Sequence, residues 1–227
     1  MARRWIEDFI EVKTNKRDFT FADLEAAVGA GVEGFRALYV AGTRLRVQKA
    51  TVFSAESAPD VPIGKAMRIS AGVPLLSQAA RLDGDVFLDG GLYANYPLDV
   101  FDNARFLPED ERELGKPTPG TARDAAIVNR QTLGLRVDTR DQIAQIISGK
   151  EPRRVASFRE FLSTLIESYI ERMNRIHLDA DDWSRTVFID AEGVSAFEFD
   201  LGPEAIDRLV EMGKSGARAY LVWFTSQ

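Results

Sequence analysis

The chain has 227 residues, a formal net charge of −6 and 45% hydrophobic residues, an ordinary composition for a globular protein. The interspersed charges argue against broad nucleic-acid binding, which needs a basic face, and no segment is long and apolar enough to span a membrane. Cysteine is absent and His177 is the single histidine, so disulfides, thiolate chemistry and multi-histidine metal sites are excluded.

The first eight residues (MARRWIED) interrupt any apolar run with acids, which is unlike a signal peptide. We therefore expect a cytoplasmic protein or one that is peripheral to a membrane, with a secreted effector lacking cysteine left open.

In chain order, the spacing of apolar residues predicts helices over 3–12 and 19–28, a buried strand over 36–42 and its hairpin partner over 45–53. A helix then begins at Pro62 and runs to about residue 70. A strand follows that ends at Asp89, and the next helix runs from Pro97 to residue 106.

Residues 107–124 are rich in Pro, Glu, Gly and Thr and are predicted to form a surface loop. A strand over 131–137, a long helix over 155–176, a strand over 186–189 and a helix from Pro203 follow. Strands that alternate with helices, without an evident linker, predict an α/β layered domain over residues 1–227.

Two glycine motifs lack the context that their chemistry needs. Residues 29–34 (GAGVEG) match G-x-G-x-x-G, but a helix precedes them and a strand follows, the reverse of a dinucleotide site, which favours a helix end and a loop. Residues 213–215 (GKS) resemble the end of a P-loop, but Arg208 stands where its first glycine belongs, inside an amphipathic helix. We interpret this motif as a solvated helix face.

Two further groups of polar residues are better explained by structural roles than by metal binding or catalysis. His177 is followed by three aspartates at 179, 181 and 182, a set that could bind a metal but is more typical of a polar helix terminus. Ser70 lies in half of a nucleophile elbow, yet Arg68 replaces the small residue that the elbow needs two positions earlier. We therefore expect neither a metal nor a cofactor.

Asp89 is the strongest candidate for a catalytic residue. It ends an apolar strand and is followed by two glycines in residues 86–91 (VFLDGG), and a second ordered element begins at residues 95–97 (NYP). A tight hairpin corner would explain Asp-Gly alone. Because sites in open α/β sheets gather at the carboxyl ends of strands, we expect a carboxylate held at the edge of the sheet.

These segments resemble the C-terminal signatures of the patatin-like phospholipases. The resemblance rests on residues 70–74 (SAGVP), 89–91 (DGG) and 95–97 (NYP), with further segments in the same order from Phe19 to Val137 and around Gly213, and it covers essentially the whole chain. It implies a three-layer α/β sheet with flanking helices. It also implies a serine acyl hydrolase that acts on phospholipids, lysophospholipids or other acyl esters through a Ser-Asp dyad without histidine.

Under this resemblance Asp89 is the dyad aspartate, which orients and deprotonates the serine. Gly90 and Gly91 let the loop bring the carboxylate to the serine, and Asn95 and Pro97 brace that loop. A carboxylate with an ordinary pKa of about 3.9 is a weak base for a hydroxyl, so the mechanism depends on close geometry and on an oxyanion hole.

The sequence departs from the family at its start, because neither a glycine-rich oxyanion loop nor a complete G-x-S-x-G occurs in it. We therefore expect the C-terminal part of a patatin-like domain, incomplete because the N-terminal strands and the nucleophile helix are absent, and inactive by itself. Its expected partners are a lipid or acyl-ester substrate, a membrane surface and an N-terminal segment that supplies the serine, with no nucleic acid.

The alternative is a non-catalytic lipid-binding or regulatory module derived from the family. A third hypothesis makes Ser70 an unconventional nucleophile.

Overall fold

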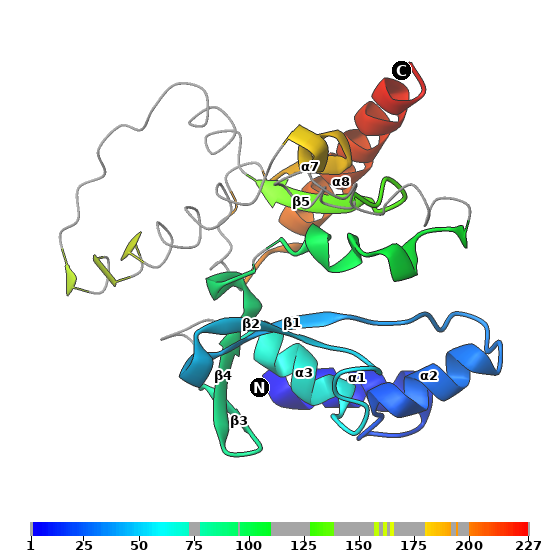
Figure 1. The fold of residues 1–227 in the computed structure, drawn as a ribbon. Helices are drawn as coiled ribbons and strands as arrows, with labels where there is room; N and C mark the ends of the chain where they lie inside the picture. Colours follow the sequence, from blue (N-terminus) through cyan, green and yellow to red (C-terminus); the bar gives the residue numbers. More distant parts are fainter. Residues whose placement is uncertain are drawn as a thin grey trace, which may run out of the picture. The chain divides into compact units, whose positions relative to one another are not determined.

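The structure is a computed structural model that describes residues 2–72, 78–94, 96–109, 128–138, 157–158, 161–162, 164–165, 180–191, 194 and 200–226. The chain divides into two compact units (Figure 1). The first comprises Met1–Pro97 and Arg159–His177, and the second comprises Leu98–Phe158 and Leu178–Gln227.

Three helices of the first unit form because their apolar residues recur at helical spacing. They are α1 (Ala2–Thr14), α2 (Phe21–Gly29) and α3 (Ile63–Ser70). The N-terminus of α2 is a capping box, in which Thr20 accepts from the Asp23 backbone N–H and Asp23 accepts from the Thr20 backbone N–H.

The sheet of the first unit is antiparallel throughout. Its strands are β1 (Val40–Arg44), β2 (Lys49–Phe53), β3 (Ala80–Leu82) and β4 (Asp85–Asp89), in the spatial order β2-β1-β4-β3. The short helix η1 (Leu45–Val47) joins β1 to β2. Phe21, Phe53, Ile69 and Phe87 lie at the centre of a buried apolar cluster that links α2, α3 and the sheet.

The second unit contains a parallel strand pair covered by a long helix. β5 (Gly134–Asp138) pairs with β6 (Thr186–Asp190), and α7 (Ala180–Ser184) directly precedes β6. The helix α8 (Pro203–Phe224) packs against β6. It approaches closely because position 216 is glycine: a Cβ there would lie 2.6 Å from the Phe188 carbonyl oxygen.

The mixed α/β class with a sheet and flanking helices is confirmed. The helices predicted over 3–12, 19–28 and 62–70 and the one from Pro203 are all present within a few residues. The strand predicted over 36–42 begins only at Val40. No helix in the part of the chain that the structure describes is both long and apolar enough to cross a membrane.

The helix predicted from Pro97 to residue 106 is wrong. The chain forms two short 3₁₀ helices there, η3 (Leu98–Phe101) and η4 (Ala104–Phe106). Between them the Asn103 side chain accepts from the Arg105 backbone N–H, a local bond that competes with a continuous helix. The predicted helix over 155–176 and loop over 107–124 lie largely outside the described residues.

Candidate active site around Asp89

Asp89 lies at the carboxyl end of β4 and its backbone is fixed on two sides. It pairs with Gly42 of β1, and its backbone N–H donates to the Gly72 carbonyl oxygen at 3.1 Å, just beyond the end of α3. The sheet is antiparallel, so the rule for parallel strands does not account for this position. A neighbouring strand and a helix end hold the aspartate instead.

The carboxylate of Asp89 begins a short 3₁₀ helix, η2 (Gly90–Leu92). Its Oδ1 accepts from the Gly91 backbone N–H at 2.8 Å, so the side chain is the N-cap of this turn. Burial raises the pKa of Asp89 above its ordinary value, and the hydrogen bond from Gly91 offsets part of that rise. The result is a half-buried carboxylate that accepts a proton more readily than an exposed one.

Glycines allow the backbone to close around this aspartate. A Cβ on Gly90 would lie 2.8 Å from the Ala41 carbonyl oxygen and 2.9 Å from the Ala41 Cβ. A Cβ on Gly72 would lie 2.9 Å from the Ile69 carbonyl oxygen, and one on Gly42 would lie 2.7 Å from the Ile69 Cγ2. Only glycine fits at these positions without movement of its neighbours.

Three of the four residues predicted to support the Asp89 loop lie within the described part of the chain. Gly90 and Gly91 are buried in η2, and Pro97 is half-buried directly before η3. Asn95 lies outside the described residues. The bracing role of Asn95 and Pro97 therefore stays a prediction.

Ser70 is the last residue of α3, only two positions before the residue that binds the Asp89 N–H. The fold thus brings the end of α3 and the end of β4 together, although they are distant in the sequence. No hydrogen bond joins the described side chains of Ser70 and Asp89, and Ser70 stands on a helix end, unlike the strand-turn-helix of a nucleophile elbow.

Both glycine motifs have the structural roles predicted for them. Gly29 ends α2, and Gly31 and Gly34 follow in loop conformations with positive φ angles of 71° and 84°. Lys214 of the GKS motif lies within α8 and forms an exposed ion pair with Glu211 at 2.6 Å.

Two of the three aspartates that follow His177, Asp181 and Asp182, make structural contacts. Asp182 binds Arg185, and the Asp181 carbonyl accepts from the Ser184 hydroxyl. Within the described residues no three His, Asp or Glu side chains gather in a way that could hold a metal ion. His177 and Asp179 lie outside those residues.

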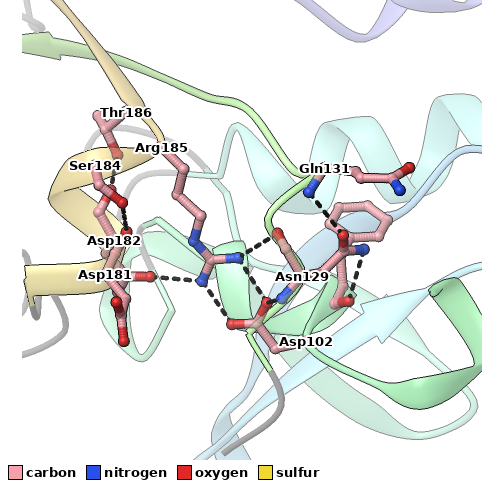
Figure 2. A network of polar contacts seen from close by, with 9 residues as sticks. Asp102, Asn129, Gln131, Asp181, Asp182, Ser184, Arg185 and Thr186 are labelled. Carbon is pink, nitrogen blue, oxygen red and sulfur yellow. Dashed lines mark hydrogen bonds and ion pairs between the residues drawn. The ribbon is translucent and has the colours of Figure 1, made fainter. Parts of the chain in front are cut away.

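A buried network in the second unit was not predicted from the sequence. Figure 2 shows Arg185 donating through both terminal nitrogens to the two carboxylate oxygens of Asp102, each at 2.6 Å, and also to Asp182 at 2.6 Å. The same aspartate accepts from the backbone N–H of Asn129, whose carbonyl accepts from Arg185. The hydrogen bonds to Asp102 raise the pKa of Arg185 further above its ordinary value. This network fixes three loops and is interpreted as structural support.

A small apolar cavity lies in the first unit between α2 and the residues that flank β1 and β2. It measures about 150 Å³, and its lining includes Leu24, Leu38, Tyr39 and Ser54. Sites for drug-sized ligands usually measure about 300–1,000 Å³. The cavity is therefore too small for a whole lipid, and Asp89 remains the candidate for chemistry.

Comparison with known proteins supports the family assigned from the motifs. Residues 2–102 match the family model described as patatin-like phospholipase. The uncharacterized protein R571 of Acanthamoeba polyphaga mimivirus is 32% identical over 98 residues, which cover 43% of this chain and 30% of the relative. The probable lipid hydrolase 463L of Invertebrate iridescent virus 6 is 24% identical over 95 residues, or 42% of this chain and 31% of the relative.

Among solved structures, the crystal structure of VipD from Legionella pneumophila is similar with a TM-score of 0.49 and 17% identity, over 91% of this chain and 35% of VipD. The matches to both viral relatives span less than a third of those proteins. The match over residues 2–102, which include Asp89 and its glycines, confirms the resemblance to the patatin-like phospholipase family for that segment of the chain.

Proposed function

We propose that this chain supplies the dyad aspartate, Asp89, of a serine acyl hydrolase that acts on phospholipids, lysophospholipids or related acyl esters. The observation that carries the proposal is the half-buried carboxylate at the fixed end of β4, whose pKa is raised by burial. Its location within the matched family segment supports this role.

The properties of this carboxylate suit a base that works on a serine hydroxyl. A raised pKa moves a carboxylate closer to the operating pH, where proton transfer is most effective. The Gly91 hydrogen bond fixes the side-chain orientation, and the tight glycine contacts hold the backbone, so little reorganisation is needed during reaction.

The proposed reaction begins as the serine Oγ attacks the ester carbonyl carbon and its proton passes to the Asp89 carboxylate. Negative charge develops on the carbonyl oxygen and is stabilised by backbone N–H donors of an oxyanion hole. Collapse of this intermediate expels the alcohol, which takes the proton from Asp89. Water then attacks the acyl-serine with Asp89 again as base, releasing the fatty acid and restoring the serine.

In this proposal a separate segment supplies the serine and the oxyanion hole, because the 227 residues contain no complete G-x-S-x-G. We therefore propose that the chain represents the C-terminal part of the catalytic domain and works together with a segment that carries the elbow. The low share of the viral relatives that it matches supports this reading.

The same lack of an elbow motif favours a second candidate function, a non-catalytic module that binds lipid. Such a module would keep an apolar binding surface and the family fold without ester hydrolysis.

The two functions are separated by reconstitution. The chain is co-expressed with a family segment that carries the glycine-rich loop and the G-x-S-x-G elbow, and hydrolysis of a p-nitrophenyl ester and of a phospholipid is measured. We expect activity that Asp89→Asn lowers by at least about 100-fold, because a general base contributes about 10²–10⁴ in rate. The matched control is Asp83→Asn in the turn before β4, where asparagine tolerates the φ of 49°.

Three outcomes would contradict the proposal. Activity that survives Asp89→Asn would remove Asp89 from the mechanism. Lipid binding by the chain, without hydrolysis in any reconstituted pair, would favour the non-catalytic module. Labelling of the chain alone by a fluorophosphonate probe, lost in Ser70→Ala, would instead identify Ser70 as the nucleophile.

A further inference from the structure

The last turn and a half of α8 exposes an unusual run of apolar side chains. Residues 220–224 (YLVWF), called here the α8 tip, are followed by Thr225 and Ser226. The exposed fractions are 56% for Leu221, 71% for Val222, 43% for Trp223 and 59% for Phe224. A cluster of large apolar side chains that are this exposed is typical of a surface that binds a protein or a membrane.

Two contacts hold α8 to its unit before and at the start of the tip. Gly216 lets the helix approach the Phe188 carbonyl of β6, and the Tyr220 hydroxyl donates to the Ser184 carbonyl at 3.1 Å. The Trp223 and Phe224 rings contact the Tyr220 ring one turn back, at centroid distances of 5.6 Å and 6.0 Å. The red end of α8 extends beyond α7 in Figure 1.

We propose that the α8 tip inserts into the interface of a lipid surface that carries anionic headgroups. Five consecutive apolar residues, each about 100° further around the helix, cover every side of it. A helix that docks in a protein groove needs only one apolar stripe, whereas a helix that is apolar on all sides is buried, either in a protein core or in a membrane.

Composition and charge favour a lipid surface over a second protein. Trp223 and Tyr220 carry the amphipathic rings that prefer the boundary between headgroups and acyl chains. Glu211 is the last acidic residue of the sequence, and the charged residues after it are Lys214 and Arg218. Lys214 pairs with Glu211, and Arg218 interacts with the same carboxylate at longer range. Arg218 is exposed and lies less than one turn before the tip, where it provides the cationic contact with anionic headgroups.

This inference is independent of the proposed Ser-Asp chemistry, because membrane insertion needs no dyad. It is tested on the full chain carrying Trp5→Phe and Trp183→Phe, which leaves Trp223 as the single tryptophan. Vesicles of phosphatidylcholine with phosphatidylserine are titrated in, with pure phosphatidylcholine vesicles as comparison. We expect a blue shift of Trp223 emission and quenching by lipids brominated on the acyl chain.

Paired variants locate the contact. Leu221→Ser with Phe224→Ser is expected to lower the vesicle partition coefficient at least about tenfold, since two large apolar side chains no longer leave water. The matched control is Val12→Ser with Phe9→Ser, which removes one aliphatic and one aromatic side chain, 83% and 52% exposed, from α1. Arg218→Gln is expected to lower partition into anionic vesicles about fivefold and to leave binding to neutral vesicles unchanged.

Several results would overturn the inference. The inference fails if Trp223 emission does not change when vesicles are added, or if the tip variant and the parent partition equally into vesicles. Loss of binding only in the α1 variant would assign membrane contact to α1. A dimer in analytical ultracentrifugation that the tip variant converts to monomer, with vesicle binding unchanged, would assign the tip to a second copy. We expect each variant to fold, because every altered side chain is exposed, and far-UV circular dichroism checks this.

Discussion

Substitution of Gly90 by alanine tests whether close backbone packing holds Asp89 in place. The added Cβ would lie 2.8 Å from the carbonyl oxygen, 2.9 Å from the carbonyl carbon and 2.9 Å from the Cβ of Ala41. Ordinary contact begins near 3.4 Å, so β1 and η2 must separate by about 0.6 Å. The contacts involve backbone atoms that cannot rotate away, so relief requires movement of the strand end.

Overpacking of this kind typically costs about 1–3 kcal/mol, and the backbone contacts place Gly90→Ala in the upper part of that range, at about 2–3 kcal/mol. For a urea dependence of about 2–3 kcal/mol per molar, the unfolding midpoint should fall by about 1 M. The local effect should be visible at the Asp89 amide, which donates to Gly72, as roughly 50-fold faster hydrogen exchange.

The control is Gly29→Ala at the end of α2. A Cβ there meets nothing within 4 Å, and alanine is a better helix former than glycine. This variant should unfold at the parent midpoint or slightly above it. If Gly90→Ala behaves like Gly29→Ala, in both urea midpoint and Asp89 exchange, then the packing against Ala41 does not hold the aspartate and the reasoning fails.

Two further predictions concern buried charges. Burial raises the pKa of Asp89, so the protonated form favours the folded state: the contribution of Asp89 to stability is present below its ordinary value of 3.8 and is lost as pH rises through the folded-state pKa. Asp89→Asn should therefore be at least as stable as the parent at pH 7, and this advantage should disappear as the pH falls to 3.8. Urea titrations at both pH values measure the difference, and a variant less stable than the parent at pH 7 would contradict the expected sign. Asp102→Ala leaves buried Arg185 without its bidentate partner and should cost about 3–5 kcal/mol in unfolding free energy, against about 0.5 kcal/mol or less for the exposed control Asp99→Ala; equal losses would refute the network.

Local features of the sequence predicted the elements that local chemistry controls. The helix that begins at Pro203 and the hairpin of β1 and β2 follow from proline placement and alternation, which act over a few residues. The position of Asp89 at the end of β4 followed from its neighbours 86–91 in the same way. Short or polar elements such as β3 and α7 gave no periodic signal and were missed.

What the sequence could not predict depends on contacts between distant segments. Nothing in the sequence marks Asp102 and Arg185 as partners. The fold places the Asp102 Oδ2 2.6 Å from the Arg185 Nη2. Gly42 and Gly72 likewise appear as ordinary glycines, and their importance arises only because Ile69 and its helix lie against them. The antiparallel pairing of β1 with β4 also depends on tertiary contacts, which is why reasoning from parallel sheets placed Asp89 correctly for the wrong reason.

The parallel pairing of β5 with β6 has a kinetic consequence. Gly134 pairs with Thr186, so the chain must close a loop of about 50 residues before this strand pair gains its first bond. The hairpins of β1 with β2 and of β3 with β4 close over a few residues and form on a far shorter timescale. During synthesis β4, which carries Asp89, can therefore pair with β3 early. β5 can pair with β6 only after the ribosome has released residues up to β6.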